Sequence, residues 1–595
     1  MKPNKKNNIE NYKVIDLFAG AGGLSNGFEQ TGKFEVLGAV EINPAAVKTY
    51  IRNHDNNEDI IIKENNGEIS DITKIDFYKF INCKNLSGDE IIIIGGPPCQ
   101  GFSNANRQKN YLISGNNQLV KEFVRAVDEI KPVAFLLENV KTMKSEVHKF
   151  FVTEHIEETI FSYSSEEHLS LITKKDKEKL KKLLKQDSIT LIETKHENLR
   201  TILEQIFIQD EIKPIIENKK YISRLRSIER YINKSNYIKL KTKKEINEVS
   251  NLIKYLKGKV DNDSFVRKLK LNSILTSAIK VLNLVKEQEI NKEEIQNNIG
   301  PLIDLNRFIL NYKELIDEKI IFEQPLCIHN INNKITVNAN VKSYNIVEYL
   351  EYVFSYYGYE IDYNTLDASD FGVPQRRNRF MFLGVKEKFA LKEVKLPLKS
   401  NFFINKSTTK DAISDLEEIP PQKDIVNYTP TPYNEFHNLS LLQCYYRKNS
   451  SLIFNHINTK SRELSIKRFK AIKESGGENF HSLSDDMKST YTDSSRTQNT
   501  IYLRLNYFEP SPTVVNVRKS MWNHPKNAVA LSIREAARLQ SFRDNFIFFG
   551  TKDQQYQQVG NAVPPLLARA VAEKLLNIIG DKPVISIEEE FKEYK

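Results

Sequence analysis

The residue whose type and position most favour chemistry is Cys99. Four consecutive isoleucines, Ile91–Ile94, predict a fully buried strand of a parallel sheet, and Gly-Gly-Pro-Pro ends that strand abruptly. The thiol therefore follows the carboxyl end of a central strand, where open α/β sheets bind their ligands. A thiolate at that position could act as a nucleophile. A lone cysteine is also common as a small buried hydrophobe, and this alternative stays open on these residues alone.

Two other kinds of side chain are predicted at the same edge of the sheet. Glu138 follows the apolar stretch Val133–Leu137, and a carboxyl beside a buried strand tends to have a raised pKa, which suits a proton donor. Arg377 and Arg379 come directly before the apolar stretch Phe380–Val385 and would present planar cations suited to carbonyl or phosphate groups. The simpler explanations are an acid that satisfies a helix N-terminus and a basic cluster on the surface.

A glycine-rich turn near the N-terminus indicates a nucleotide site. The predicted strand Val14–Phe18 is followed by Ala19–Leu24, and glycines in such a turn let the backbone approach a ligand closely. Glu41 ends the next strand, about twenty residues on, where an acid can accept hydrogen bonds from ribose hydroxyls. Asp71 could meet an adenine amino group, or it could cap a helix. The order favours an adenosine-containing cofactor; a tight structural turn and a solvated Glu41 form the alternative.

Length and composition limit the number of domains and the class of protein. The chain has 595 residues, which predicts two or three domains, and a formal net charge of +10, which permits a polyanionic partner without requiring one. Its four cysteines are scattered with no CxxC pair, so neither a disulfide framework nor a metal site is expected. No apolar segment approaches the length that spans a membrane. We expect a cytoplasmic protein that acts as a monomer and binds no membrane.

The character of the sequence changes twice along the chain. Residues from about 150 to 335 are dense in Lys and Glu, poor in Gly, and carry apolar stripes at helical spacing, which predicts a mostly helical insertion. Its lysines could meet phosphates, although a solvated helix face is the commoner explanation. Residues 400–525 interleave basic and aromatic side chains between Pro breaks, as nucleic-acid-binding surfaces do, although polar loops have a similar composition.

Helix signals return near the C-terminus. Ser532, with Glu535 three residues on, predicts a capped helix. Two prolines open a last helix, which is expected to stop at Gly580. We expect the residues beyond Gly580 to fray.

Seven stretches in one order resemble the DNA (cytosine-5) methyltransferase family: DLFAGAGGL, VEIN, GGPPCQGFS, LLENV, FGVPQRRNR, REAARLQSF and QVGNAVPP. Their order is far more specific than any single motif. The resemblance covers about 1–145, 341–390 and 528–580, and more loosely 400–525. It implies the α/β, Rossmann-like fold of S-adenosylmethionine-dependent methyltransferases, a mostly parallel sheet with helices on both faces. A helical insertion and a smaller, irregular target-recognition domain would be added to it.

The resemblance also implies roles for individual residues. Cys99 would add to C6 of cytosine, and Glu138, protonated, would hydrogen-bond the ring nitrogen N3. Arg379 would contact the cytosine O2, and Arg377 would hold the carboxylates and the thiol in place. The residues assigned to S-adenosylmethionine are Phe18, Ala19, Gly20, Gly22, Gly23, Leu24, Glu41, Ile42, Asp71, Ile72, Pro98, Asn561 and Ala562. Those assigned to DNA are Gln100, Ser103 and Gln375, and the loop from Gln100 to about Gly115 would close over an extruded base.

The implied activity is methyl transfer from S-adenosylmethionine to C5 of cytosine in a specific sequence of double-stranded DNA, within a bacterial restriction-modification system. A cognate restriction endonuclease acting separately would be a further partner. Two alternatives stay open: an RNA (tRNA) cytosine-5 methyltransferase on the same scaffold, and a DNA-binding regulator without catalysis. The expected segments are a first catalytic part (1–148), the insertion (149–338), a second catalytic part (339–392), the target-recognition domain (393–527) and a C-terminal catalytic part (528–595).

Overall fold

The computed structural model falls into two compact units, each described here by itself. The first contains the described residues within 11–98, 117–145 and 350–595, and the second those within 149–349. The structure describes residues 11–64, 67, 69–98, 117–145, 149–152, 182–209, 212–232, 236–240, 242–331, 334–435, 438–491 and 494–595. The five-part division of the chain stays a prediction.

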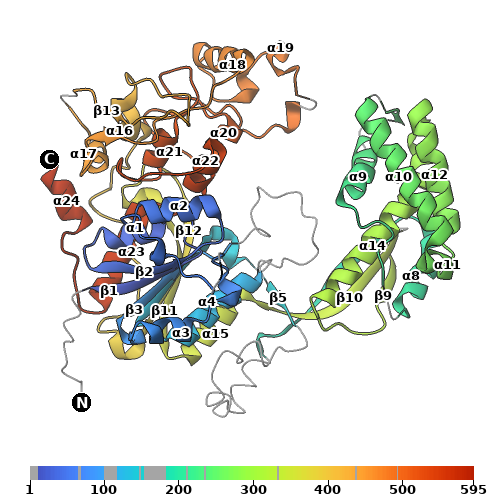
Figure 1. Cartoon of the computed structure of the whole chain (residues 1–595), viewed down its shortest axis with the longest axis horizontal. Coiled ribbons are helices and arrows are strands. Elements are labelled where there is room, and N and C mark those ends of the chain that lie inside the picture. Colours follow the sequence, from blue (N-terminus) through green and yellow to red (C-terminus); the bar gives the residue numbers. More distant parts are fainter. Residues whose placement is uncertain are drawn as a thin grey trace. The chain divides into compact units, whose positions relative to one another are not determined.

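The first unit is built on a six-stranded sheet in the order β11-β12-β4-β3-β1-β2 (Figure 1). Strands β4, β3, β1 and β2 are parallel, and β12 is antiparallel to both of its neighbours. The strands are β1 (Tyr12–Leu17), β2 (Phe34–Val40), β3 (Ile91–Gly95), β4 (Ala134–Val140), β11 (Tyr359–Asp367) and β12 (Asn378–Lys386). The predicted fold class, a mostly parallel α/β sheet, is confirmed.

Both faces of this sheet are covered, which explains why its central strands are apolar without alternation. Successive side chains of a strand point to opposite faces. On one face, Ile92 and Ile94 of β3 share a core with residues of α1 (Gly23–Glu29) and α23 (Pro565–Ile578). On the other, Phe135 of β4 packs on Phe123 of α4 and Phe354 of α15. Besides α1 and α23, the helices of this unit outside residues 393–527 are α2 (Pro44–Arg52), α3 (Phe77–Cys83), α4 (Asn117–Ile130), α15 (Ile346–Tyr356), α21 (Ile533–Leu539), α22 (Lys552–Asn561) and α24 (Ile587–Glu593).

The C-terminal segment is more ordered than the sequence analysis expected. Ser532 caps α21 and forms a capping box with Glu535, which confirms that prediction. The expectation that the tail frays is wrong, because Ser586 caps α24 and the side chain of Phe591 is fully buried. Glu590 of the same helix forms an ion pair with the buried Arg569 of α23. A charge pair and an aromatic anchor therefore fix the last helix.

Residues 393–527 pack in the first unit as an irregular region with short elements. These are α16 (Thr409–Ile413), β13 (Thr431–Pro432), α17 (Leu441–Arg447), β14 (Leu452–Ile453), α18 (Glu463–Glu474), α19 (Asp485–Lys488) and α20 (Val517–Ser520). The region is joined to α21 by buried charge: Arg538 lies 2.5 Å from Asp415 and 2.6 Å from Asp544, and all three side chains are fully buried. A buried cation shared by two carboxylates fixes the region against α21.

The second unit has its own core. Its strands are β5 (Lys149–Phe151), β6 (Lys185–Thr194), β7 (Tyr237–Ile238), β8 (Ile290–Asn291), β9 (Cys327–Ile331) and β10 (Lys334–Asn345). Its helices are α8 (Arg200–Phe207), α9 (Lys219–Ile232), α10 (Lys243–Asn262), α11 (Ser264–Lys268), α12 (Asn272–Glu287), α13 (Lys292–Asn298) and α14 (Gly300–Asp317). A continuous apolar cluster joins these helices to β6 and β10. The long strand β6, which pairs with β10, was not predicted.

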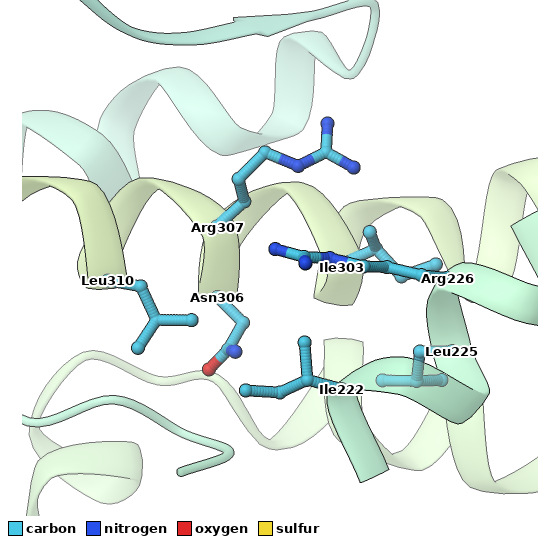
Figure 2. Close-up of a pocket in the computed structure, with 7 residues that line it drawn as sticks. All are labelled: Ile222, Leu225, Arg226, Ile303, Asn306, Arg307 and Leu310. Atoms are coloured by element: carbon cyan, nitrogen blue, oxygen red, sulfur yellow. The ribbon is translucent and has the colours of Figure 1, made fainter. Parts of the chain in front are cut away.

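A small pocket lies between α9 and α14 of this unit (Figure 2). The volume open to water-sized molecules is about 20 Å³, roughly enough for one water molecule. The lining residues are Ile222, Leu225, Arg226, Ile303, Asn306, Arg307 and Leu310. The side-chain amide of Asn306 is already bonded to the backbone of Ile216, and Arg307 is paired with Glu229. We therefore interpret the pocket as a packing defect.

Replacing Arg538 with alanine is expected to lower the free energy of unfolding by about 3 kcal/mol or more, because two buried carboxylates would lose their shared cation. Denaturant titration measures this difference. The matched control is Arg376→Ala, which removes an arginine that is 56% exposed and paired with Glu509 at 3.1 Å. An exposed pair contributes less than about 1 kcal/mol. Equal losses in the two variants would contradict the role given to Arg538.

Candidate active site

The turn after β1 leaves room for a ligand at the backbone. Phe18, Gly20 and Gly22 have positive φ angles of 57°, 57° and 90°. A Cβ added at Gly20 would meet no atom within 4 Å, whereas one at Gly23 would lie 2.4 Å from the carbonyl oxygen of Val563. Gly20 therefore borders open space that a bound group could occupy. Gly23 serves a different purpose, because its missing side chain lets α1 and the C-terminal segment pack closely.

Glu41 links this turn to the end of β2. One carboxylate oxygen accepts from the backbone N–H of Gly20 at 2.8 Å and the other from that of Asn43 at 2.6 Å. Burial raises the pKa of Glu41, and these N–H donors oppose the rise. The neighbouring Ile42 side chain is 64% exposed, so an apolar surface lies open beside a fixed acid. This combination fits the ribose and base of a nucleoside.

Asp71 lies on the loop that follows. Its carboxylate accepts from the backbone N–H and the hydroxyl of Thr73, so it caps a short 3₁₀ helix, the alternative that the sequence analysis left open. Ile72 is buried. Arg125 of α4 donates to the carbonyl oxygens of Ile72 and Ile75 at 2.6 and 2.8 Å and holds the loop in place. Sequence reasoning missed Arg125, because no motif marks it.

The other residues assigned to the cofactor have different environments. Ala19 and Pro98 are half-buried, and Leu24 belongs to the core. Asn561 is exposed and accepts from Gln557, while Ala562 is buried beside Gly23, where α1 begins. The far end of the chain therefore returns to the first glycine turn.

Glu138 and Arg379 form an ion pair at the end of β4. The distance from Arg379 Nε to Glu138 Oε1 is 2.7 Å, and the two side chains are 13% and 12% exposed. Burial raises the pKa of Glu138, although the nearby guanidinium groups oppose this shift. The pair adjoins the segment after β3: a Cβ at Gly96 would lie 2.8 Å from Glu138 Oε2, and Asn139 donates to the carbonyl oxygen of Pro97.

Three residues assigned to chemistry or DNA lie outside the described part of the chain. These are Cys99, Gln100 and Ser103, together with the loop 100–115 that was expected to close over a base. The described segment ends at Pro98, two residues after the glycine that faces Glu138.

Arg377 is fully buried and connects segments that are distant in sequence. Its guanidinium donates to the carbonyl oxygens of Val514, Gly560 and Ala562 at 2.9–3.0 Å. Burial and the nearby Arg379 lower its pKa. The sequence analysis assigned Arg377 to holding carboxylates and the thiol; the observed bonds are to backbone carbonyls, so we revise its role to fixing the turn that carries Ala562.

Gln375 also requires a correction. Its side chain is fully buried; its amide nitrogen donates to Gln540 Oε1 and Leu539 O, and its oxygen accepts from the backbone N–H of Val514. A side chain whose polar atoms are all bonded inside the protein does not present them to DNA. We therefore withdraw Gln375 from the DNA-contacting residues, and its motif position marks a structural connector.

A second buried acid lies beneath the glycine turn and was also missed. Asp16 of β1 is 1% exposed and accepts from the hydroxyl of Tyr50 at 3.2 Å. Tyr50 stacks on His54, whose ring nitrogen Nε2 lies 3.4 Å from Glu29. Burial raises the pKa of Asp16 to about 7. A Cβ at Gly22 would lie 3.0 Å from the Tyr50 ring. The contacts among Asp16, Tyr50 and His54 therefore support the glycine turn.

The described residues contain no cluster of three or more His, Cys, Asp or Glu side chains placed to hold a metal. None of the helices described here is long and apolar enough to cross a membrane.

Comparison with known proteins agrees with this geometry. The family model for C-5 cytosine-specific DNA methylases matches residues 12–160 and 330–577, more than half of the chain. The chain belongs to that family. The matched ranges contain Glu138, Arg379, the glycine turn and Ala562, and they flank most of the second compact unit.

Individual methylases are similar over parts of their length. Type II methyltransferase M.DdeI from Desulfomicrobium norvegicum is 32% identical over 39% of this chain and 59% of its own length. Type II methyltransferase M1.HphI from Haemophilus parahaemolyticus is 31% identical over 42% of this chain and 56% of its own length. The chain thus spans less than two-thirds of these relatives. A solved DNA modification methyltransferase from an E. coli prophage has 18% identity and a TM-score of 0.46, covering 96% of this chain and all of that one.

The raised pKa of Asp16 makes the stability of this methylase depend on pH. The folded protein binds a proton at Asp16 up to about pH 7, whereas an unfolded aspartate releases it near pH 4. Asp16 therefore lowers the free energy of unfolding as pH rises from about 4 to 7, by at most about 1.4 kcal/mol per pH unit.

Asp16→Asn should remove this dependence, because its amide oxygen still accepts from Tyr50 and carries no charge. Relative to the natural protein, the variant is expected to gain stability between pH 5 and pH 8, measured by urea unfolding at both values. A difference between the two proteins that does not change with pH would show that Asp16 keeps an ordinary pKa.

Proposed function

We propose that the protein transfers a methyl group from S-adenosylmethionine to C5 of cytosine in a specific sequence of double-stranded DNA. The observation that carries the proposal is the buried Glu138–Arg379 pair, which adjoins the segment leading to Cys99 in a member of the cytosine-5 methylase family. Methylation in a bacterial restriction-modification system follows from the same family membership. A separate cognate endonuclease, a cytoplasmic location and a monomeric state are parts of the same proposal.

The cofactor implied by the family is S-adenosylmethionine, and the residues present suit it. The open space at Gly20 can accept the amino-acid part, and Glu41 can accept ribose hydroxyls with its remaining lone pairs. The exposed Ile42 can cover one face of the adenine. When bound, the cofactor supplies an electrophilic methyl group. Phe18, Ala19, Gly22, Gly23, Leu24, Asp71, Ile72, Pro98, Asn561 and Ala562 complete the proposed pocket.

Cys99 is the proposed nucleophile. Cytosine C5 is a weak nucleophile until the thiolate adds to C6, forming an S–C6 bond and moving an electron pair toward C5. Burial raises the pKa of Glu138. In its protonated form Glu138 would donate to the ring nitrogen N3 and stabilise that charge, while Arg379 would contact O2. After methyl transfer, loss of the C5 proton and departure of the sulfur restore the ring. The base that takes this proton is not part of the proposal.

The target carbon lies inside the DNA stack, so the base must be extruded before the thiol can reach it. Gln100 and Ser103 are proposed to contact the vacated site and the flanking phosphate. Residues 393–527 are proposed to read base edges in the major groove. These side chains come from an irregular region that buried ion pairs such as Arg538–Asp415 fix in place.

Cys99→Ala tests covalent catalysis. Methyl transfer to DNA should fall below detection, because no other residue in the proposal can attack C6, while binding of S-adenosylmethionine measured by calorimetry stays within about twofold. The natural protein should also form a covalent complex with a duplex containing 5-fluorocytosine, and Cys99→Ala should not. Residual turnover above about one part in a thousand would rule the mechanism out.

Bisulfite sequencing of DNA from cells that express the natural protein identifies the substrate and the modified site together. Methylated tRNA with unmodified DNA would favour the RNA enzyme, and absence of both modifications with intact DNA binding would favour a regulator.

Glu138→Gln tests the proton donor. The amide keeps the shape of the side chain but donates less effectively to N3, so the rate constant for methyl transfer is expected to fall by about 10²–10³-fold. The Michaelis constant for S-adenosylmethionine should change little. In the natural enzyme, activity should fall as pH rises through the raised pKa of Glu138, and this limb of the pH profile should be absent from the variant. An unchanged rate constant would exclude Glu138 from the chemistry.

A further inference from the structure

The second unit carries an uneven distribution of charge. Residues 243–287, which form α10, α11 and α12, include ten basic and five acidic residues. Residues 292–318, which form α13 and α14, include three basic and six acidic residues. All of these residues are described, and both segments belong to one compact unit. A helical insertion that only has to stay soluble does not require this separation of charge, because interspersed charges of both signs keep a surface soluble equally well.

The acidic residues of the basic segment are largely tied to cations. Glu245 and Glu248 pair with Arg224 of α9. Asp263 pairs with Lys259 at 2.8 Å and also caps α11. Of the two remaining acids, Asp261 lies one turn from Lys257 on α10 and Glu287 ends α12. Lys243 and Lys254 therefore have little opposing charge on the outer face of α10.

The outer face of α10 is continuous. Lys243, Lys254 and Lys257 are exposed, and their spacing of eleven and three residues places them on one side of the helix. Asn247 and Asn251 lie between them on the same side and are also exposed. The opposite side, with Val249, Leu252, Ile253 and Leu256, is buried in the core. The helix therefore has one apolar face and one face whose exposed residues from Lys243 to Lys257 are cations and amides, with the exposed acid Asp261 at its C-terminal end.

The neighbouring helices expose side chains of the same chemistry. Helices α10 and α12 pack against each other (Figure 1). The exposed residues of α12 include Asn272, Ser273, Thr276 and Lys280, and α11 adds Arg267 and Lys268. Lys, Arg, Asn, Ser and Thr are the side chains that donate hydrogen bonds to phosphate oxygens in protein–DNA complexes. We call the outward side of α10–α12 the basic face.

We propose that the basic face of α10–α12 binds the phosphate backbone of duplex DNA without reading its sequence. DNA is the partner that the observations favour, because the face combines cations with neutral donors and exposes few large apolar side chains. A protein partner would more often require an apolar centre within the contact. That the polyanion is DNA rests on the proposed function, whereas the binding surface does not depend on methyl transfer.

Such a surface would add affinity that depends on salt. Each lysine that neutralises a phosphate contributes a slope of about −0.9 to the dependence of log affinity on log salt concentration. Losing three contacts should therefore reduce the steepness by roughly 2–3 and weaken binding by about tenfold or more near 0.1 M salt. The loss should be the same for cognate and unrelated sequences.

The test compares two triple variants of the full chain. Lys243→Gln/Lys254→Gln/Lys257→Gln removes three charges from the basic face. Lys292→Gln/Lys313→Gln/Lys334→Gln removes three charges from elsewhere in the same unit, where Lys313 and Lys334 pair with Asp317 and Glu193. Fluorescence anisotropy with an unmethylated 40-base-pair duplex, between 50 and 300 mM salt, gives the dissociation constant and the slope of log affinity against log salt concentration. Circular dichroism and thermal melting check that both variants are folded.

The proposal requires the first variant to bind more weakly and with a shallower slope, and the second to bind like the natural protein. Equal behaviour of all three proteins would overturn it. It would also be overturned if polyglutamate competed as well as DNA at equal charge concentration, because the face would then bind acidic protein. Methyl transfer by the natural protein is measured separately. If the natural protein is inactive but the first variant still binds DNA more weakly than it does, the proposed function is refuted and this inference stands.

Discussion

The burial of guanidinium groups is the constraint on which the first unit depends. Arg377, Arg534, Arg538 and Arg569 are all fully buried. A charge taken out of water is costly unless it is paired or hydrogen-bonded. Here the guanidinium groups donate to backbone carbonyls and carboxylates from segments that are far apart in sequence, such as Val514 and Gly560 for Arg377. Their donors can be satisfied only when those segments come together, so these contacts specify the assembly of a discontinuous chain.

The same reasoning explains the Glu138–Arg379 pair. Glu138 is buried and would favour its neutral form in isolation, whereas Arg379 favours the charged form. The balance leaves the pKa raised, which keeps a proton on the carboxyl at higher pH than an exposed glutamate would. Arg377 does not bond to Glu138, but its charge is close enough to oppose the shift. The pKa of Glu138 is therefore set by competition between desolvation and two cations: Arg379, which pairs with it, and Arg377, which joins distant segments of the chain.

Much of the fold could be predicted because it is encoded locally. Strands such as Ile91–Ile94 are fully apolar, and caps such as Ser532 with Glu535 lie within three residues of each other. The site was harder to predict. The motifs identify Glu138 and Arg379, but nothing local distinguishes Gln375, which bonds inside the protein, from a side chain that faces DNA. Asp16 and Tyr50 meet only in the folded chain, so their contact has no sequence signal.

The second unit shows how a long insertion can be tolerated. Its first described strand, β5, pairs antiparallel with the end of β10, and Lys149 lies opposite Asn345. Paired strands are about 5 Å apart, so the inserted chain leaves its own unit close to where it entered. Closing a long loop costs only slightly more than closing a short one when the inserted residues form their own core. The apolar cluster around α10, α12 and α14 supplies that core. The pairing of β5 with β10 therefore lets the sequence of α10–α12 vary without disturbing the six-stranded sheet of the first unit. Under this condition a charged face can be acquired.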